Sequence, residues 1–405
     1  MGLTSLIAVV TVAVSLVNGA PLSQEKRQAP SGVPDYVLKY APIVYLHSEE
    51  KYYPTDLQSF LDHTTPRVDF NEVPGPSKPL RTSNLDQMAN NVWLTSNDDV
   101  TTDPTWIKGT KPNASGKTEG ATTAAIIVND KGNGNVDAFY MYFYAYNYGG
   151  EVLGWKQLNF GNHVGDWEHT MVRFSNGQPT AIWFSQHANG QAFRYSAVER
   201  DAAGIRPIAY SSKGSHANYA MGGTHDHTIP NLNLPGGVLE DYTNRGTVWD
   251  PLLSAWYYKF TPSTNKFEAY DGQAPTAWLN FRGRWGDQEY PESDKRQFKL
   301  FGQAKFSGGP TGPADKQLNR EKVCPENGRL CILRSILVPR KAGMDGAFAE
   351  RDEVVGGTEG KEVLSKWIVC IRHQYSGFST EVLAQACVDE SMDDTKSTLS
   401  ELLKR

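Results

Sequence analysis

The sequence lacks long apolar runs, an excess of positive charge and the motifs of several common enzyme classes. Its formal net charge of −5 argues against a nucleic-acid partner, because contacts to phosphates need clustered Lys and Arg. Beyond residue 20, no stretch approaches the roughly 20 apolar residues of a membrane-spanning helix, so no transmembrane segment is expected. No internal repeat, C-x-x-C pair or G-x-S-x-G motif is present. These absences disfavour a zinc ribbon and a serine hydrolase built on a nucleophile elbow.

The first 27 residues are predicted to be removed. The apolar run over residues 6–17 is too short to span a membrane and is followed by small residues, which is typical of a secretory signal peptide over residues 1–20. Residues 21–27 end in Lys26-Arg27, a pair that a dibasic-specific protease of the secretory pathway could cut, and we interpret them as a short propeptide. We therefore expect a chain that begins at Gln28 and is secreted, with the vacuole as a second destination.

Cysteine is scarce, and all four cysteines lie in the last quarter of the chain. An even number of cysteines in a secreted protein favours two disulfides. Three connectivities are open, and the most local one joins Cys324 to Cys331 and Cys370 to Cys387.

The composition changes near residue 315, where charged and helix-favouring residues appear together with the cysteines. We assign residues 28–314 to one β domain and residues 315–405 to a small helical, disulfide-containing extension. Its end, residues 395–405, has the pattern of an amphipathic helix. Within the domain, Asn113-Ala-Ser115 is a sequon in a loop-like stretch, so a glycoprotein is expected.

Aromatic residues and glycine are plentiful, with 10 Trp, 19 Tyr and 37 Gly. Short segments rich in β-branched and aromatic residues alternate with Gly- and Asn-containing turns, which predicts a mainly β fold, an antiparallel β-sandwich with long loops. Residues 65–120 are polar and rich in Pro, Asn, Asp and Thr, and are expected to form loops. The expected sandwich segments are residues 41–47, 124–128, 138–148, 180–187, 193–198, 206–212, 256–260 and 277–285.

One of these segments, residues 138–148, carries tyrosine at every second position. On a strand, side chains at alternate positions share one face. We expect this face to pack against a second sheet in the core, and the alternative is a platform that contacts sugar or lipid. The tyrosines concerned are Tyr140, Tyr142, Tyr144, Tyr146 and Tyr148.

The stretch over residues 161–174 concentrates chemically active side chains, because His163, Asp166, Glu168 and His169 fall within seven positions beside Trp167. On a strand, Asp166 and Glu168 share one face, while Trp167 and His169 share the other. Two carboxylates at this spacing repel each other unless a cation, an arginine or a proton lies between them. Oxygen and imidazole donors suit Ca²⁺, Mg²⁺, Mn²⁺ or Zn²⁺, so a divalent cation is the expected cofactor.

Structural roles are the alternative for this motif: Asp166 could cap a turn, Glu168 could pair with an arginine, and the histidines could be satisfied inside the fold. However, six of the nine histidines lie between positions 163 and 227, and His163, His187 and His216 fall at strand ends or in Gly-containing turns. Strand ends of a sandwich gather at one rim, where loops build sites on a rigid scaffold. The clustering therefore favours a functional site at the rim.

Three sets of site residues follow from this pattern. The candidate metal ligands are His163, Asp166, Glu168 and His187. The candidate catalytic residues are Glu168, His169 and His216. The candidate substrate contacts are Trp167, Arg194 and Tyr219.

Five segments in order make the chain similar to the vacuolar protein sorting-associated protein 62 family, which occurs in fungi and plants, so a fungal source is expected. The resemblance covers about residues 40–290 and leaves out the cysteine-containing extension. The family name refers to a sorting phenotype, and the resemblance implies no settled chemistry. The segments are Ile43-Val-Tyr-Leu-His47, His163-Val-Gly-Asp-Trp-Glu-His169, Phe184-Ser-Gln-His187, Tyr210-Ser-Ser-Lys-Gly-Ser-His216 and Trp278-Leu-Asn-Phe-Arg-Gly-Arg-Trp-Gly286.

A weaker similarity is to the necrosis- and ethylene-inducing-peptide-like toxins, β-sandwich proteins marked by the motif G-H-R-H-D-W-E. Residues 163–168 match its H-x-x-D-W-E spacing, whereas Asn162 replaces the Gly and Gly165 replaces the second His. In those toxins the motif lies at a divalent-cation site used at plant membranes. The resemblance implies a similar fold.

Three functions remain open. The chain could be a secreted hydrolase, metal-assisted or based on carboxylates and histidines, that acts on polysaccharide or another extracellular polymer. It could be a cation-dependent, toxin-like protein that binds a membrane head group or sugar without turnover, or a structural protein of the secretory pathway. A hydrolase needs a deep cleft with perturbed carboxylates, and a surface binder needs a rim with exposed Trp and Tyr. We favour a cation-binding protein that acts on or binds an extracellular polymer, with turnover left open.

Overall fold

The computed structural model describes residues 29–75, 79–152, 155–226, 239–300 and 302–338. The predicted signal peptide and propeptide, Cys370, Cys387 and the helix expected over residues 395–405 lie outside the described residues. Within the described ranges, no helix combines the length and the hydrophobicity that crossing a membrane requires.

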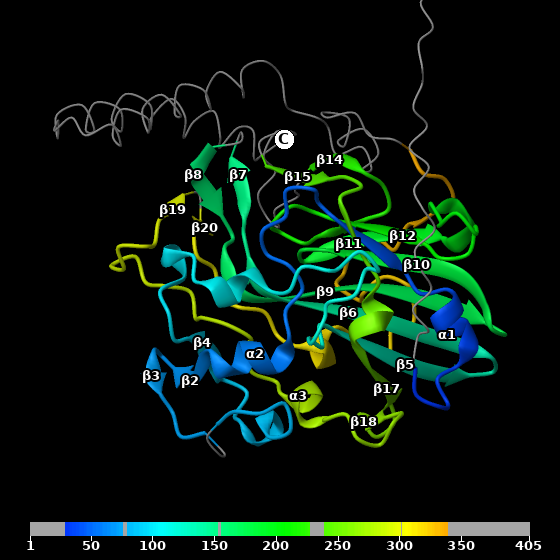
Figure 1. Ribbon diagram of the computed structural model, residues 1–405, viewed down its shortest axis with the longest axis horizontal. Helices are drawn as coiled ribbons and strands as arrows, with labels where there is room; N and C mark the ends of the chain where they lie inside the picture. Colours follow the sequence, from blue (N-terminus) through cyan, green and yellow to red (C-terminus); the bar gives the residue numbers. More distant parts are fainter. Residues whose placement is uncertain (1–28, 76–78, 153–154, 227–238, 301, 339–405) are drawn as a thin grey trace, which may run out of the picture.

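An eight-stranded sheet forms the centre of the molecule (Figure 1). Its long central strands carry the β-branched and aromatic residues that fit a pleated surface, and both of its faces are buried. Its strands, in spatial order, are β18 (Lys266–Ala269), β17 (Ala255–Thr261), β5 (Ala124–Gly132), β6 (Asn135–Asn147), β9 (His163–Ser175), β10 (Gln178–Gln186), β11 (Asn189–Arg194) and β21 (Leu333–Arg334).

A four-stranded sheet packs on one face of the central sheet, so the two form a sandwich. Tyr140, Tyr142 and Tyr144 of β6 lie fully buried between them with Trp249, as expected for a core strand. The expected face of five tyrosines is interrupted, because Tyr146 packs in the cluster on the opposite face of the sheet. The second sheet consists of β13 (Asn218–Tyr219), β12 (Ile208–Ser211), β1 (Ile43–Leu46) and β16 (Thr247–Trp249).

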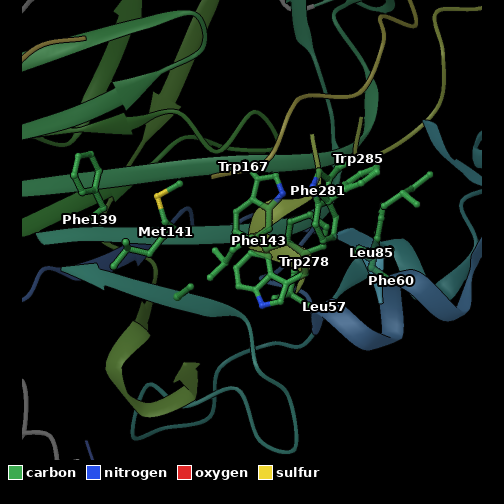
Figure 2. Close-up of a cluster of buried hydrophobic side chains, with 14 of the residues drawn as sticks. Leu57, Phe60, Leu85, Phe139, Met141, Phe143, Trp167, Trp278, Phe281 and Trp285 are labelled. Carbon is green, nitrogen blue, oxygen red and sulfur yellow. The ribbon is translucent and has the colours of Figure 1, made fainter. Parts of the chain in front are cut away.

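Short helices and loops cover the opposite face (Figure 2). There Trp167 stacks on Trp278 with ring centroids 5.4 Å apart, and Trp285 meets both rings edge-on. Helix α2 (Leu57–Asp62) buries Leu57 and Phe60 in this layer. It begins after Asp56, whose carboxylate accepts a hydrogen bond from the Ser59 amide at 2.8 Å, a typical N-cap.

The segment over residues 277–285, expected to extend the sandwich, instead forms α3 (Ala277–Asn280) and a loop. Burial of Trp278 and Trp285 on the existing sheet outweighs the local preference for a strand. The remaining elements are α1 (Asp35–Lys39), β2 (Thr64–Val68), β3 (Asn71–Glu72), β4 (Trp93–Ser96), β7 (Gly150–Val152), β8 (Trp155–Phe160), β14 (Gly223–Asp226), β15 (Glu240–Thr243), β19 (Lys299–Leu300), β20 (Gln303–Ala304) and six 3₁₀ turns over residues 85–87, 100–102, 105–108, 195–197, 251–254 and 313–315.

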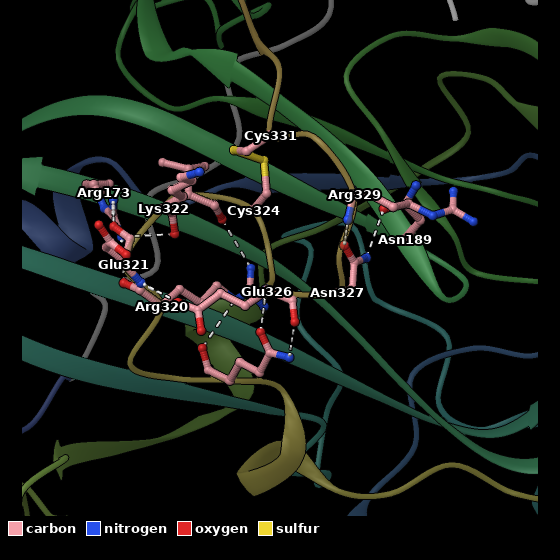
Figure 3. The surroundings of a disulfide bond; sticks show 12 residues. Arg173, Asn189, Arg320, Glu321, Lys322, Cys324, Glu326, Asn327, Arg329 and Cys331 are labelled. Carbon is pink, nitrogen blue, oxygen red and sulfur yellow. Dashed lines mark hydrogen bonds between the residues drawn. A yellow bond between two sulfur atoms is a disulfide. The ribbon is translucent and has the colours of Figure 1, made fainter. Parts of the chain in front are cut away.

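The C-terminal segment over residues 316–338 crosses one face of the central sheet, and its strand β21 pairs with the edge strand β11 (Figure 3). Cys324 and Cys331 form the predicted local disulfide, with Cα atoms 5.5 Å apart. The guanidinium of Arg173 binds Asp137 in a bidentate pair and also donates to backbone carbonyls of residues 320–322. The segment that the sequence separates from the β domain is therefore joined to it by side-chain hydrogen bonds and by the pairing of β21 with β11, and the disulfide closes a loop within the segment.

The prediction of a mainly β, sandwich-like fold with few helices and a disulfide near the C-terminus is confirmed. Most strand pairs are antiparallel, as expected. Among the strands of the described ranges, three pairs are parallel: β1 with β12, β5 with β17, and β11 with β21.

Candidate functional site

The motif over residues 163–169 lies on β9, in the middle of the central sheet. In the register with β6, Asp166 lies opposite Tyr144 and Glu168 lies opposite Tyr142. The side chain of Trp167 points to the other face, into the tryptophan cluster. The alternation predicted for the motif therefore holds for these three residues.

Gly165 fixes the backbone just before the two carboxylates. It has a φ of +66°, and a Cβ at this position would lie 2.3 Å from the carbonyl oxygen of Trp285. The left-handed conformation and the close backbone contact both require glycine. The histidine of the toxin motif has no room at this position, so the chain departs from that motif at Gly165 and keeps its Asp166, Trp167 and Glu168.

Strands β9 and β10 separate beside Glu168. Their ladder ends at the pair Thr170–Phe184, and beyond it the amide of His169 donates to Oγ of Ser185 at 2.8 Å instead of to a backbone carbonyl. The Ser185 hydroxyl in turn donates to Oε2 of Glu168. The separation leaves space at the strand ends, and the carboxyl of Glu168 lies against it.

A cavity of about 320 Å³ occupies this space. This volume is at the lower end of the range for small-molecule sites. Its charged and titratable lining residues are His163, Asp166, Glu168, His187 and Lys316. The structure therefore brings together all four candidate metal ligands, and it adds a lysine from the C-terminal segment.

Asp166 is held by His216, which lies behind the cavity wall. Nδ1 of His216 is 2.9 Å from Oδ2 of Asp166, Nε2 is 2.9 Å from the carbonyl oxygen of Tyr52, and the ring stacks on Tyr144 at 3.7 Å. Burial alone would raise the pKa of Asp166, but the hydrogen bond from His216 and the charges of the neighbouring histidines and lysine lower it below its usual value. Asp166 is therefore an ionised carboxylate at neutral pH.

Glu168 is perturbed in the opposite direction. Burial, followed by the nearby negative charge of Asp166, raises the pKa of Glu168 to about 7, although the Ser185 hydrogen bond opposes the shift. The proton on Glu168 relieves the repulsion that the sequence predicts between the two carboxylates. Adjacent groups whose pKa values are moved apart are typical of acid–base sites.

His163 has one defined hydrogen bond, from Nδ1 to the carbonyl oxygen of Gly165 at 2.7 Å. A carbonyl only accepts, so Nδ1 carries the proton. Burial lowers the pKa of His163, so the ring is neutral at pH 7 and Nε2 carries the lone pair. A backbone carbonyl that fixes one ring nitrogen in this way is common behind metal-binding histidines.

His187 sits at the end of β10 with a φ of +54°, and Nε2 lies 2.7 Å from Oδ2 of Asp241. Burial opposes its protonation, but Asp241 outweighs this and raises the pKa of His187. Asp241 also accepts hydrogen bonds from Ser212 at 3.0 Å, Ser215 at 2.5 Å and Tyr219 at 2.7 Å. It is the central acceptor of a buried network that orients His187.

Four sequence-predicted site residues do not line the cavity, and His216, described above behind its wall, is one of them. Tyr219 is buried, and its hydroxyl is bound to Asp241, so it supports the site from behind. Arg194 is exposed at the end of β11 and does not line the cavity. His169 points to the opposite face of the sheet, where Nε2 accepts a hydrogen bond from Arg320 at 2.8 Å.

The catalytic position assigned to His169 is therefore corrected, because strand alternation turns its ring away from Glu168. Burial, reinforced by the charge of Arg320, holds the pKa of His169 well below its usual value. Sequence reasoning also missed Ser185, Asp241 and Lys316. Ser185 carried a signal, since it directly precedes Gln186 and His187 at a strand end, whereas Lys316 carried none.

The donor set fits a divalent cation in its chemistry, with two carboxylates and two imidazoles. In the part of the chain that the structure describes, however, no three His, Cys, Asp or Glu side chains are arranged so as to hold a metal ion. Asp166 and Glu168 are instead hydrogen-bonded to His216 and Ser185.

Comparison with solved structures finds necrosis- and ethylene-inducing-type proteins. Necrosis and ethylene inducing protein 2 from the causal agent of cocoa's witches' broom disease is 15% identical, with 50% of this chain and 74% of that chain covered and a TM-score of 0.23. NLPPya in complex with mannosamine is 13% identical, with 55% and 72% covered and a TM-score of 0.25. TM-scores this low support no inference about this chain, and its fold class is assigned from its own sheets.

Comparison of amino-acid sequences finds higher identities than comparison with solved structures. The vacuolar protein sorting-associated protein 62 family matches residues 28–301. The putative vacuolar protein sorting-associated protein TDA6 of Saccharomyces cerevisiae is 36% identical over 347 residues, covering 76% of this chain and 72% of the relative. Vacuolar protein sorting-associated protein 62 of the same yeast is 33% identical over 375 residues, covering 83% and 78%. The chain therefore belongs to the vacuolar protein sorting-associated protein 62 family.

Proposed function

We propose that the chain is a hydrolase of the secretory pathway that cleaves an extracellular polysaccharide in the cavity beside β9. The observation that carries the proposal is the pair Asp166 and Glu168, which face one cavity and have pKa values moved in opposite directions. Such a pair provides an acid and a base at the same pH.

In the proposed reaction, the protonated carboxyl of Glu168 donates its proton to the bridging oxygen as the glycosidic bond breaks. The carboxylate of Asp166 accepts a proton from the water that adds to the sugar carbon, so one water is consumed for each bond cleaved. His216 holds Asp166 in its ionised form, and Ser185 orients the carboxyl of Glu168. His187, which Asp241 holds in place, provides a second fixed hydrogen-bonding group at the cavity.

The distribution of exposed aromatic side chains disfavours the toxin-like alternative. A protein that binds a surface without turnover needs exposed aromatic residues around its site. Among the described side chains, the exposed large hydrophobic residues are Phe70, Tyr242 and five aliphatic residues over 330–338, and none of these lines the cavity.

A divalent cation is the second candidate, as cofactor of the same site. The orientation of His163, whose Nε2 lone pair remains available as a ligand, favours it. The ion would be held by His163, Asp166 and Glu168, with His187 as a fourth ligand, and would supply a polarised water or substrate oxygen. Asp166 and Glu168 would have to exchange their present hydrogen-bond partners for the ion.

The test is release of reducing ends from a panel of soluble polysaccharides, with protein dialysed against chelator and assayed with and without added Ca²⁺, Mg²⁺, Mn²⁺ or Zn²⁺. We expect activity that survives chelation and is lost in Glu168→Gln. Activity restored only by a metal, together with that metal in elemental analysis, would establish the cation candidate. Absence of turnover on every polymer would contradict the hydrolase.

The proposal includes entry into the secretory pathway, which rests on the predicted signal peptide and the dibasic pair Lys26-Arg27. Mass spectrometry of secreted or vacuolar protein should find Gln28 at the amino terminus. Asn113 is exposed in its loop, so the sequon is accessible to glycosylation, and treatment with an N-glycosidase should lower the mass. Recovery of intact protein with Met1 would contradict this route.

A further inference from the structure

Lys316 enters the cavity from a part of the chain that lies beyond the family match over residues 28–301. It follows the 3₁₀ turn Pro313–Asp315, and its amide donates to the carbonyl oxygen of Pro313 at 3.0 Å. The carbonyl oxygen of Lys316 accepts a hydrogen bond from Arg320 at 2.8 Å. The backbone that carries this side chain is therefore fixed on both sides.

Arg320 anchors the segment in the sheet (Figure 3). Its side chain is only 1% exposed and lies over the rings of Phe139 and Trp183. It donates to His169 and to backbone carbonyls, and no carboxylate of the described residues lies within 4.0 Å of it. A buried cation held in this way makes the position of the segment specific.

Two carboxylates beside the cavity have a cationic partner at hydrogen-bond distance, whereas Lys316 acts on Asp166 and Glu168 only from a longer distance. Asp166 is matched by His216, and Asp241 is matched by His187. Within the described ranges, no carboxylate oxygen lies within 4.0 Å of Nζ of Lys316.

We propose that Lys316 forms a subsite for an anionic group, so that the cavity takes an acidic carbohydrate whose sugar bears a carboxylate or a phosphate. This inference rests on the proposed function for the identity of the polymer. An ammonium at a cavity wall is a common ligand for such anions, and a charge-assisted hydrogen bond in a partly enclosed site is strong.

A role as plain counter-ion to Asp166 and Glu168 fits the geometry less well. A lysine that serves a carboxylate closes to hydrogen-bond distance, as Lys213 does with Glu49 at 2.6 Å. Lys316 and the two carboxylates instead border the same open volume without forming an ion pair. A ligand between them can give an anionic group to Lys316 and a bridging oxygen to Glu168.

Binding of an oligogalacturonate, compared with the same oligomer as its methyl ester, tests the subsite. Wild-type protein and Lys316→Met are compared, with Lys316→Arg to restore the charge and Lys266→Met, remote on β18, as the matched control. We expect wild type to prefer the acid over the ester by about tenfold, the value of one charge-assisted hydrogen bond. Lys316→Met should lose this preference, and Lys316→Arg and Lys266→Met should retain most of it.

Equal binding of acid and ester by wild type, or an undiminished preference in Lys316→Met, would overturn the subsite. Glu168→Gln protein is tested in the same assay, so the result does not depend on turnover. If hydrolysis fails while the Lys316-dependent preference holds, the subsite stands and the reaction does not. Competition by glucuronate and by glucose 6-phosphate then identifies the preferred anion, and competition by uncharged glucose of equal strength would again contradict the subsite.

Discussion

Replacement of Glu168 by glutamine should stabilise the folded protein at high pH and not at low pH. The pKa of Glu168 rises from 4.5 to about 7 on folding because the carboxyl is buried beside Asp166. At about 1.4 kcal/mol per pH unit, holding this carboxyl ionised in the folded state costs about 3 kcal/mol. The glutamine side chain cannot ionise, and it keeps an oxygen that accepts from Ser185.

The stabilisation by Glu168→Gln appears only at high pH, because the unfolded state loses the proton of Glu168 at a lower pH than the folded state does. The folded pKa lies above the unfolded one, so the contribution of this group to stability is fully present below pH 4.5 and is lost as pH rises through about 7. Glu168→Gln should therefore be close to wild type at about pH 4 and more stable by about 3 kcal/mol at about pH 8.

Urea denaturation of both proteins at the two pH values, in the presence of chelator, measures this difference. Glu268→Gln, exposed on β18, is the matched control and should show no such gain. A Glu168→Gln effect that is the same at both pH values would refute the assignment of Glu168 as a buried acid. The variant should meanwhile lack polysaccharide hydrolysis, which separates loss of chemistry from loss of fold.

Three further substitutions probe the rest of the site. Asp166→Asn removes the nearer of the two carboxylates that face the buried His216, since Glu50 lies at 3.9 Å, and should lower the free energy of unfolding at neutral pH by about 3 kcal/mol. Urea denaturation measures the loss, hydrolysis should be abolished, and wild-type stability would contradict the pairing. Gly165→Ala should lower the free energy of unfolding by about 3 kcal/mol or more, because the methyl group meets the Trp285 carbonyl in addition to the left-handed strain. Gly120→Ala, also at positive φ but with no atom within 4 Å, should lower it by only about 1 kcal/mol. Equal thermal melting of the two variants would count against the close contact. Replacement of Cys324 and Cys331 by serine should lower the free energy of unfolding by about 2 kcal/mol. Mass analysis after alkylation of unreduced protein should find no free thiol at any of the four cysteines, and an alkylated cysteine would contradict the two predicted disulfides.

Local periodicity was enough to predict the centre of the fold. The alternation along residues 138–148 and 163–174 placed Tyr142 and Tyr144 in the core and Asp166 and Glu168 on one face, and the structure agrees. The same alternation had already placed His169 with Trp167 on the other face. The catalytic role predicted for His169 assumed that a residue next to Glu168 in sequence is also next to it in space. On a strand, adjacent side chains point to opposite faces.

Contacts between segments far apart in the sequence determine the elements that local periodicity does not predict. Residues 277–285 have the composition of a strand, but their tryptophans are buried on an existing sheet as a short helix and loop. Residues 65–120, expected as loops, contain the small β2–β3–β4 sheet. Lys316 reaches the cavity because Arg173 and Arg320 fix a segment about 150 residues further along the chain than β9, and no local pattern reports such a contact.

The most direct test of the hydrolytic site is the pH dependence of kcat/KM for reducing-end release from the best polysaccharide, with chelator present. Since Glu168 must carry its proton and Asp166 must not, the account predicts activity that is high at about pH 5 and falls by about tenfold for each unit above pH 7. Activity that instead rises through pH 7, or that persists unchanged in Glu168→Gln, would contradict it.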